Sequence, residues 1–174
     1  MKTLTDQLSQ YAAYHRDPRN IATHFVGIPM IVLAIATLLS RPAVMAGGLA
    51  LTPALLLTAG TVIYYLRLEL RMGLLMAVLM ALNLWLAQWL AAQATSVWLT
   101  SGVALFVVGW VFQFVGHYYE GKKPAFVDDL VGLFIGPLFV VAEVVFALGL
   151  RADLLGAIEA RVGPVRKRDL HAAS

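Results

Sequence analysis

The chain has 174 residues, of which 60% are hydrophobic and only 13% charged, and its formal net charge is +3. Soluble domains are about 45–50% apolar and about 25% charged, so this chain lacks the polar surface of a water-soluble globule. It contains no cysteine, which excludes disulfides, thiolate catalysis and Cys-ligated zinc or iron–sulfur sites. The apolar excess predicts an integral membrane protein.

The distribution of charge favours helices over a barrel. Residues 42–66 and 72–119 contain no Asp, Glu, Lys or Arg, and the second stretch is long enough for two spans at ~20 residues each. A barrel would show alternating segments of ~10 residues instead. We therefore expect an all-α, polytopic membrane helical bundle.

The first element in chain order is a short amphipathic helix over residues 3–16, which Asp17-Pro18 ends, because proline disfavours helical backbone at the residue before it. Asn20 is the expected N-cap of the first span. Four full spans are expected, over residues 21–39, 43–66, 72–92 and 97–119.

A last hydrophobic segment is expected to begin at a cap, Asp128 or Asp129, and to reach Leu150. Glu143 would be costly at the middle of a bilayer, and Gly136-Pro137 offers a break. A re-entrant or interfacial segment is therefore favoured, and a full fifth span remains the alternative.

Basic residues set the orientation, because they concentrate in cytoplasmic loops. Through four spans, seven basic residues lie on the side of the N-terminus and only Arg41 lies on the other. A re-entrant last segment makes the ratio twelve to one, and a fifth crossing makes it seven to six. The expectation is one integral membrane domain, residues 1–174, with a cytoplasmic amphipathic segment (1–20) and a basic C-terminal tail (151–174).

The expected location is a bacterial inner membrane. The net charge of +3 is attributed to loop orientation and contact with anionic lipid, so the lipid bilayer is an expected partner and nucleic acid is not. The sequence leaves the oligomeric state open.

Polar residues that can bind metal fall at one face of this bundle, since four crossings return the chain to the side on which it began. The residues that share this face are His15, Asn20, His24, Gln113, His117 and Glu120. Gln113, His117 and Glu120 follow helical spacing and point the same way. The Pro18 break lets His15 and His24 converge, although on one straight helix they would point oppositely.

Three imidazoles and a carboxylate suit iron, zinc or manganese, with Asn20 and Gln113 as groups that fix the ring orientations. Each histidine taken singly is more often an ordinary satisfied polar residue. Glu120 could pair with Lys122 or Lys123 instead, and Asp128 and Asp129 are most simply helix caps. His171, in the polar tail, is expected to be solvent-exposed.

Two blocks of the sequence resemble the motifs of the Mpo1-like family of membrane 2-hydroxy fatty acid dioxygenases, over about residues 8–139. The first block comprises Tyr14, His15, Asn20, His24, Gly27 and Pro29. The second comprises Gln113, Gly116, His117, Glu120, Lys123, Pro124, Ala125, Asp128 and Leu130, and Pro137 also fits.

The resemblance implies an Fe²⁺-dependent α-oxidation, in which a 2-hydroxy fatty acid reacts with dioxygen and is shortened by one carbon. It implies His15, His24 and His117 as iron ligands, with Glu120 a weaker candidate. Eukaryotic members of the family act in the endoplasmic reticulum. A di-iron hydroxylase or desaturase would need about eight histidines, and this chain has 4.

Two other functions remain open from the residues. A small membrane transporter would use Gln113, His117 and Glu120 as part of a polar path, although Asn83 and Gln88 are nearly the only polar residues in the middle spans. A lipid-binding scaffold would hold a structural metal.

Overall fold

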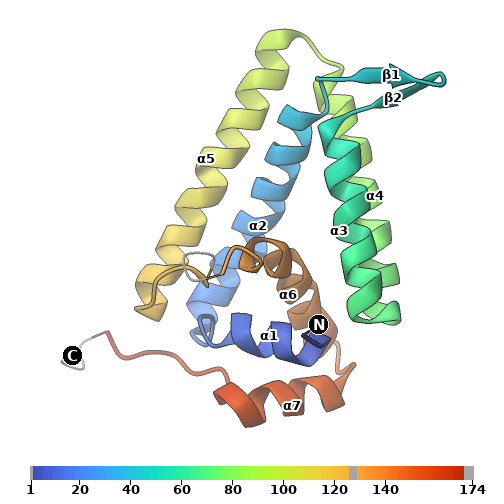
Figure 1. The fold of residues 1–174 in the computed structure, drawn as a ribbon. Helices are drawn as coiled ribbons and strands as arrows, with labels where there is room; N and C mark the ends of the chain where they lie inside the picture. The colour runs from blue at the N-terminus through green and yellow to red at the C-terminus, as the bar shows by residue number, and fades with distance from the viewer. Residues whose placement is uncertain (1, 126–128, 171–174) are drawn as a thin grey trace. The chain divides into compact units, whose positions relative to one another are not determined.

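A computed structural model describes residues 2–125 and 129–170, and Figure 1 shows that helices dominate them. The helices are α1 (Leu4–Ala12), α2 (Pro18–Leu39), α3 (Pro53–Leu68), α4 (Leu70–Ala91), α5 (Thr95–Glu120), α6 (Gly132–Ala147) and α7 (Ala152–Val162). The strands are β1 (Val44–Ala46) and β2 (Leu49–Leu51). The expected class, a helical membrane bundle, is confirmed.

Three helices are long and apolar enough to cross a membrane, namely α2, α4 and α5, with 22, 22 and 26 residues. Helix α3 is apolar but has only 16 residues, or ~24 Å at 1.5 Å per residue, against a hydrocarbon core of ~30 Å. The prediction of a second full span over residues 43–66 was therefore wrong in its start and its length.

The physical reason is a β-hairpin where that span was expected to begin. Strands β1 and β2 pair antiparallel, with Val44 opposite Leu51. Gly47 and Gly48 join them with positive φ angles of 56° and 81°, which a tight hairpin turn requires. Thr52 then caps α3, since its side chain accepts a hydrogen bond from the Leu55 amide at 3.1 Å.

The chain divides into two compact units, Pro29–Gly109 and a second unit made of Met1–Ile28 with Trp110–Ser174. Within Pro29–Gly109, α3 and α4 form a close helical hairpin. A Cβ at Gly73 would lie 2.6 Å from the Leu66 Cα, so the approach of the two backbones requires glycine. Glu69 caps α4 by accepting from the Met72 amide at 2.7 Å.

In the other unit, α1 packs against α6 and α7. Helix α1 begins with a reciprocal capping box between Thr3 and Asp6, which satisfies two amide groups of its first turn. Leu4, Leu8 and Tyr11 form its buried face. It ends at Ala12, a few residues before the expected boundary.

The last hydrophobic segment bends by 116° between α6 and α7, as a broken span or a re-entrant segment would. Pro137 lies inside α6, so the break expected at Gly136-Pro137 was misplaced. The chain turns instead at Gly149 and Arg151, with φ of 74° and 56°. Half of the expected C-terminal tail is therefore helix α7.

The start of α6 also differs from the expected cap. The Asp129 carboxylate accepts from the Val131 amide at 2.9 Å, but α6 begins at Gly132 without a side-chain cap. Asp128, the other expected cap, lies outside the described residues. The Glu143 carboxylate lies 3.7 Å from the Arg16 guanidinium, which offsets the cost of a charge on this apolar helix.

Candidate metal site

Three histidines from three segments of the chain converge in the unit that holds α1, α6 and α7. His15 lies in the turn between α1 and α2, His24 lies in α2, and His117 lies near the end of α5. Their side chains are buried, and one ring nitrogen from each lies within 4.8 Å of the others. The structure thus brings together the three imidazoles that the sequence predicted to lie at one face.

Hydrogen bonds fix which nitrogen of two rings faces the centre. The Nδ1 atoms of His15 and His24 lie 2.7 Å from the Tyr11 carbonyl and 2.9 Å from the Asn20 carbonyl. A carbonyl only accepts, so each Nδ1 carries the proton and each Nε2 keeps its lone pair. These two Nε2 atoms lie 3.0 Å apart.

Two buried lone pairs at this separation repel each other unless a cation lies between them. Two nitrogens each ~2.1 Å from an ion, at right angles, would be ~3.0 Å apart. The Nδ1 atom of His117 is buried and has no hydrogen-bond partner among the described residues. The cluster therefore fits a divalent metal ion that takes imidazole ligands.

Burial also keeps the cluster uncharged. It lowers the pKa of His15 well below the ordinary value, and the neighbouring His24 lowers this pKa further. Burial raises the pKa of the Tyr11 hydroxyl. His15 is therefore a neutral imidazole at neutral pH, the form that binds metals.

Glu120 lies beside the cluster, but its carboxylate is already engaged. Oε1 accepts from the Arg16 backbone amide at 3.0 Å, and Oε2 accepts from the Asp17 backbone amide at 2.8 Å and from the side-chain Nδ2 of Asn20 at 3.1 Å. Lys122, one of the two expected alternative partners of Glu120, donates instead to the Ala13 carbonyl at 2.7 Å. Glu120, at the end of α5, thus holds the turn in which His15 lies.

Asn20 was expected as the N-cap of the first span, and the structure corrects this. Helix α2 begins at Pro18, and the Asp17 carboxylate accepts from the Arg19 amide at 2.9 Å, as a cap does. Proline suits the first helical position because its missing N–H would have no partner there. Asn20 lies inside the helix and points toward Glu120.

Gln113 is buried one helical turn before His117, as its spacing predicted. Its Nε2 atom and the Oδ1 atom of Asn20 have no hydrogen-bond partner among the described residues. Both are buried polar atoms on the helices that carry His24 and His117, and each can bind a ligand or water that reaches it.

Gly116 allows α5 to approach α2 at this point. A Cβ there would overlap Thr23 Oγ1 and Asn20 Oδ1 and would lie 3.1 Å from His24 Nδ1. Any larger residue would push apart the helices that carry His24 and His117.

The sequence did not single out the aromatic wall of the site. The Tyr11 ring stacks on the His15 ring, with centroids 4.1 Å apart and planes inclined by 5°. Phe139 from α6 packs against both rings, and its ring centroid lies 5.0 Å from that of Tyr11 and 5.5 Å from that of His15. The four-residue spacing of Tyr11 and His15 was the available indication of their contact.

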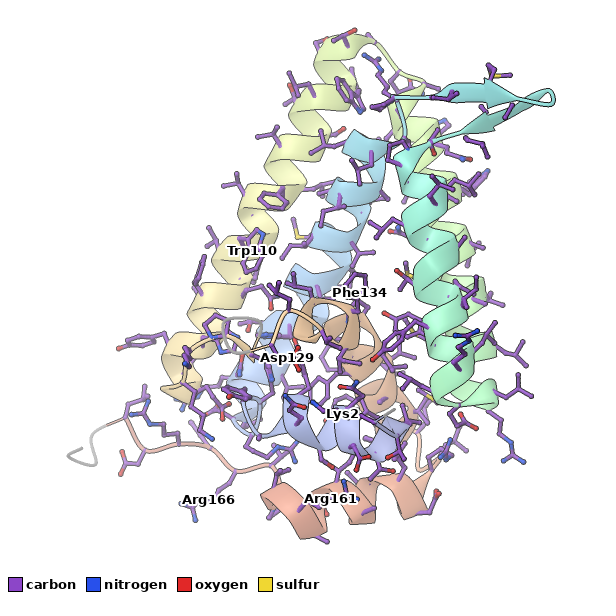
Figure 2. The ribbon with its side chains drawn as sticks, in the orientation of Figure 1. Lys2, Trp110, Asp129, Phe134, Arg161 and Arg166 are labelled. Atoms are coloured by element: carbon purple, nitrogen blue, oxygen red, sulfur yellow. The ribbon has the colours of Figure 1, made fainter. Side chains whose placement is uncertain are left out.

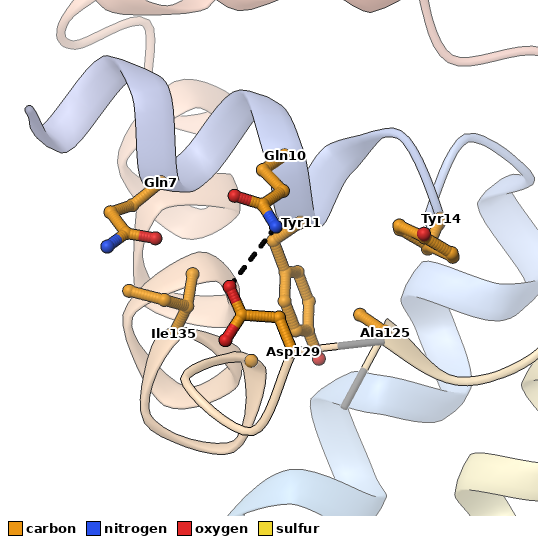
Figure 3. A pocket seen from close by; sticks show the side chains of 8 residues that line it. Gln7, Gln10, Tyr11, Tyr14, Ala125, Asp129 and Ile135 are labelled. Atoms are coloured by element: carbon orange, nitrogen blue, oxygen red, sulfur yellow. Dashed lines mark hydrogen bonds between the residues drawn. The ribbon is translucent and has the colours of Figure 1, made fainter. Parts of the chain in front are cut away.

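A cavity of about 20 Å³ borders Tyr11, and Figure 3 shows its lining. The Gln10 side chain donates to Asp129 across it at 3.2 Å. The space suits about one water molecule, so it is too small for an acyl chain.

Comparison with known proteins agrees with the motifs. The family model described as "2-hydroxy-palmitic acid dioxygenase Mpo1-like" matches residues 1–148. The 2-hydroxy-palmitic acid dioxygenase MPO1 of Saccharomyces cerevisiae is 35% identical over 158 residues, which cover 90% of this chain and 87% of the yeast protein. No solved structure matches. The chain belongs to the Mpo1-like family.

Proposed function

We propose that this protein is an Fe²⁺-dependent dioxygenase that shortens 2-hydroxy fatty acids by one carbon. The observation that carries the proposal is the buried triad of His15, His24 and His117, in which two ring nitrogens lie 3.0 Å apart. The 35% identity to a yeast 2-hydroxy-palmitic acid dioxygenase supports the reaction class.

The donor set supports iron as the metal. His15, His24 and His117 would hold it through three neutral nitrogens, a set that suits iron, zinc or manganese. Zinc has no redox chemistry, so a zinc ion at this site would not activate dioxygen. Iron with open positions would supply sites for dioxygen and for the two oxygens of the 2-hydroxycarboxylate.

The residues of the chain would hold the rings and exclude water. The carbonyls of Tyr11 and Asn20 keep the His15 and His24 rings in one tautomer and orientation, which makes the facing nitrogens better ligands. Tyr11 and Phe139 cover the His15 ring. Asn20 Oδ1 and Gln113 Nε2 would accept from or donate to substrate oxygens.

The proposed reaction balances without a further reductant. One 2-hydroxy acid and one dioxygen give the acid one carbon shorter, carbon dioxide and water. The bond between the carboxyl carbon and C2 breaks, C2 becomes the new carboxyl carbon, and dioxygen takes up the electrons.

The membrane suits this substrate, because its acyl chain can stay among apolar helices while its polar head reaches the metal. The excess of basic residues beside His15 and His117 supports a site on the cytoplasmic side. Arg19 and Lys122, which could attract a carboxylate, already bind Asp17 and the Ala13 carbonyl. Their role would therefore be a long-range field rather than direct contact.

The test is to purify the protein without oxygen, load it with Fe²⁺ and measure bound iron, oxygen consumption and products with 2-hydroxypalmitate. We expect about one iron per chain and a fatty acid one carbon shorter than the substrate. Palmitate, which lacks the 2-hydroxyl, is the matched control and should consume no oxygen. Bound metal without oxygen consumption would indicate a structural metal and would overturn the proposed dioxygenase activity.

A further inference from the structure

The turn that carries His15 is covered by an extended segment from the far end of the chain. We call residues 13–17 the His15 turn and residues 163–170 the C-terminal strap. Figure 1 shows the strap as the coil that leaves α7. Four hydrogen bonds cross between the strap and residues 16–19: Arg166 N to Arg16 O at 2.9 Å, Arg168 N to Asp17 Oδ2 at 2.7 Å, Arg19 Nη2 to Arg168 O at 2.8 Å, and Arg16 Nη1 to Gly163 O at 3.1 Å.

The strap and Glu120 hold the same turn through different groups. Glu120 accepts from the amides of Arg16 and Asp17, while the strap binds the Arg16 carbonyl and the Asp17 carboxylate. The His15 turn belongs to no helix, so these partners take the place of helical hydrogen bonds in fixing its backbone.

Asp17 joins the strap to the start of α2. Its side chain is 1% exposed, and Oδ1 accepts from both the amide and the Nε of Arg19, at 2.9 Å and 3.0 Å. Oδ2 accepts from Arg168 N and Arg19 Nη2, each at 2.7 Å. Every one of these bonds is charge-assisted, which makes the junction strong.

The strap also reaches the end of the helix that carries His117. A Cβ at Gly121 would overlap the Arg168 guanidinium, so this side chain packs directly on the backbone that ends α5. The strap therefore contacts the flanks of two histidines of the triad.

We propose that the C-terminal strap, through Asp17, positions the His15 imidazole and so sets the metal affinity of the site. The inference rests on the proposed function and extends it to residues 163–170, which lie beyond the 1–148 that match the family model. Asp17 and the strap are positioning groups, since they act on the metal only through the His15 turn.

A pair of substitutions at one position tests the strap. Arg166→Pro removes the amide that donates to the Arg16 carbonyl, whereas Arg166→Ala keeps it and loses only an exposed side chain (Figure 2). Removal of residues 163–174 deletes the strap and leaves α7 whole. Removal of residues 171–174 alone is the matched control, because every strap contact remains.

The readout is the dissociation constant for Co²⁺ alone, titrated anaerobically and followed by visible absorption. Groups that orient metal ligands change affinity by about 10–100-fold, so we expect Arg166→Pro and the longer truncation to weaken binding about tenfold or more. Arg166→Ala and the shorter truncation should bind as the parent does. Circular dichroism should show unchanged helix content in all four variants.

Hydrogen exchange gives a second readout in the parent, where the Arg166 and Arg168 amides should exchange slowly. Fast exchange of these amides would overturn the proposed role of the strap but not the metal site. Affinities within twofold of the parent for both Arg166→Pro and the longer truncation would do the same. A parent that binds no Co²⁺ would instead overturn the metal site and the proposed function with it.

Discussion

The Nε2 atoms of His15 and His24 face each other at 3.0 Å. Each opposite Nδ1 faces a backbone carbonyl, so neither ring can turn its proton inward without losing a buried hydrogen bond. The repulsion between the lone pairs is removed when a cation binds. The free energy of binding should therefore appear as added stability of the folded protein.

Metal removal provides a direct test of this relationship. Chelation should lower the melting temperature of the parent, and added Fe²⁺ or Co²⁺ should restore it, with a shift that grows with the logarithm of the free metal concentration, as linkage requires. Differential scanning fluorimetry in detergent, with and without a chelator, measures the shift. Equal melting temperatures in both conditions would contradict a metal at this site.

Substitution of a triad histidine should remove the ion. His24→Ala or His117→Ala leaves two imidazoles, and we expect bound metal to fall from about one to less than roughly a tenth per chain. Tyr118→Leu is the matched control, because Tyr118 follows His117 in the chain but its side chain is 71% exposed. Metal analysis of the purified variants decides, and full loading of His24→Ala would refute the assignment.

Glu120 should act through the His15 turn. In Glu120→Gln one oxygen becomes an NH₂ group that confronts the Arg16 amide, which approaches both carboxylate oxygens, and the remaining bonds to this turn lose the charge of their acceptor. We expect a loss of about 2–4 kcal/mol in the free energy of unfolding. Asp153→Asn neutralises a carboxylate that is 75% exposed and should leave stability unchanged. Chemical unfolding measures both, and an equal loss in the two variants would contradict the role of Glu120.

The contact between α1 and α7 should depend on pH through Asp6. The Arg161 guanidinium, which donates to this carboxylate at 2.7 Å, holds the pKa of Asp6 below its ordinary value of 3.8. The folded state thus binds fewer protons than the unfolded state. The stability that Asp6 contributes is present above pH 3.8 and is lost as pH falls below it toward the lower folded pKa.

Asp6→Asn should therefore melt slightly below the parent at pH 7, by about 1–3 °C because the pair is exposed. The difference should shrink in high salt and as the pH falls through the acid range. Melting curves from pH 7 down to pH 3 provide the measurement. A difference that does not change with pH would contradict a role for the charge of Asp6.

Short-range patterns were sufficient to predict three long helices and the triad, but they began α3 too early and missed α7. Uncharged stretches located α2, α4 and α5, and an even number of crossings with a break at Pro18 placed His15, His24 and His117 together. The glycine pair at 47–48 was read as helix, although a hairpin turn was the better interpretation of two adjacent glycines.

Contacts between residues far apart in the chain could not be predicted. The bonds from Glu120 to residues 16–17 and from Asp17 to Arg168 join positions separated by more than a hundred residues. Backbone amides and carbonyls make much of this network, and they leave no trace in a sequence. For the same reason Asn20 was read as a helix cap, when its side chain in fact donates to Glu120.

Gly116 offers a test of the helix contact that brings His24 and His117 together. In Gly116→Ala the new methyl group would overlap Thr23 Oγ1 and Asn20 Oδ1, and overpacking of this kind costs about 1–3 kcal/mol. Because the same methyl lies 3.1 Å from His24 Nδ1, we expect weaker metal binding together with lower stability.

Gly156→Ala in α7 is the matched control, since a Cβ there has nothing within 4 Å. That substitution should be neutral or stabilise the protein by about 0.5–1 kcal/mol. Co²⁺ titration and thermal unfolding of both variants give the answer, and a Gly116→Ala protein with the affinity of the parent would show that the helices can separate without disturbing the triad.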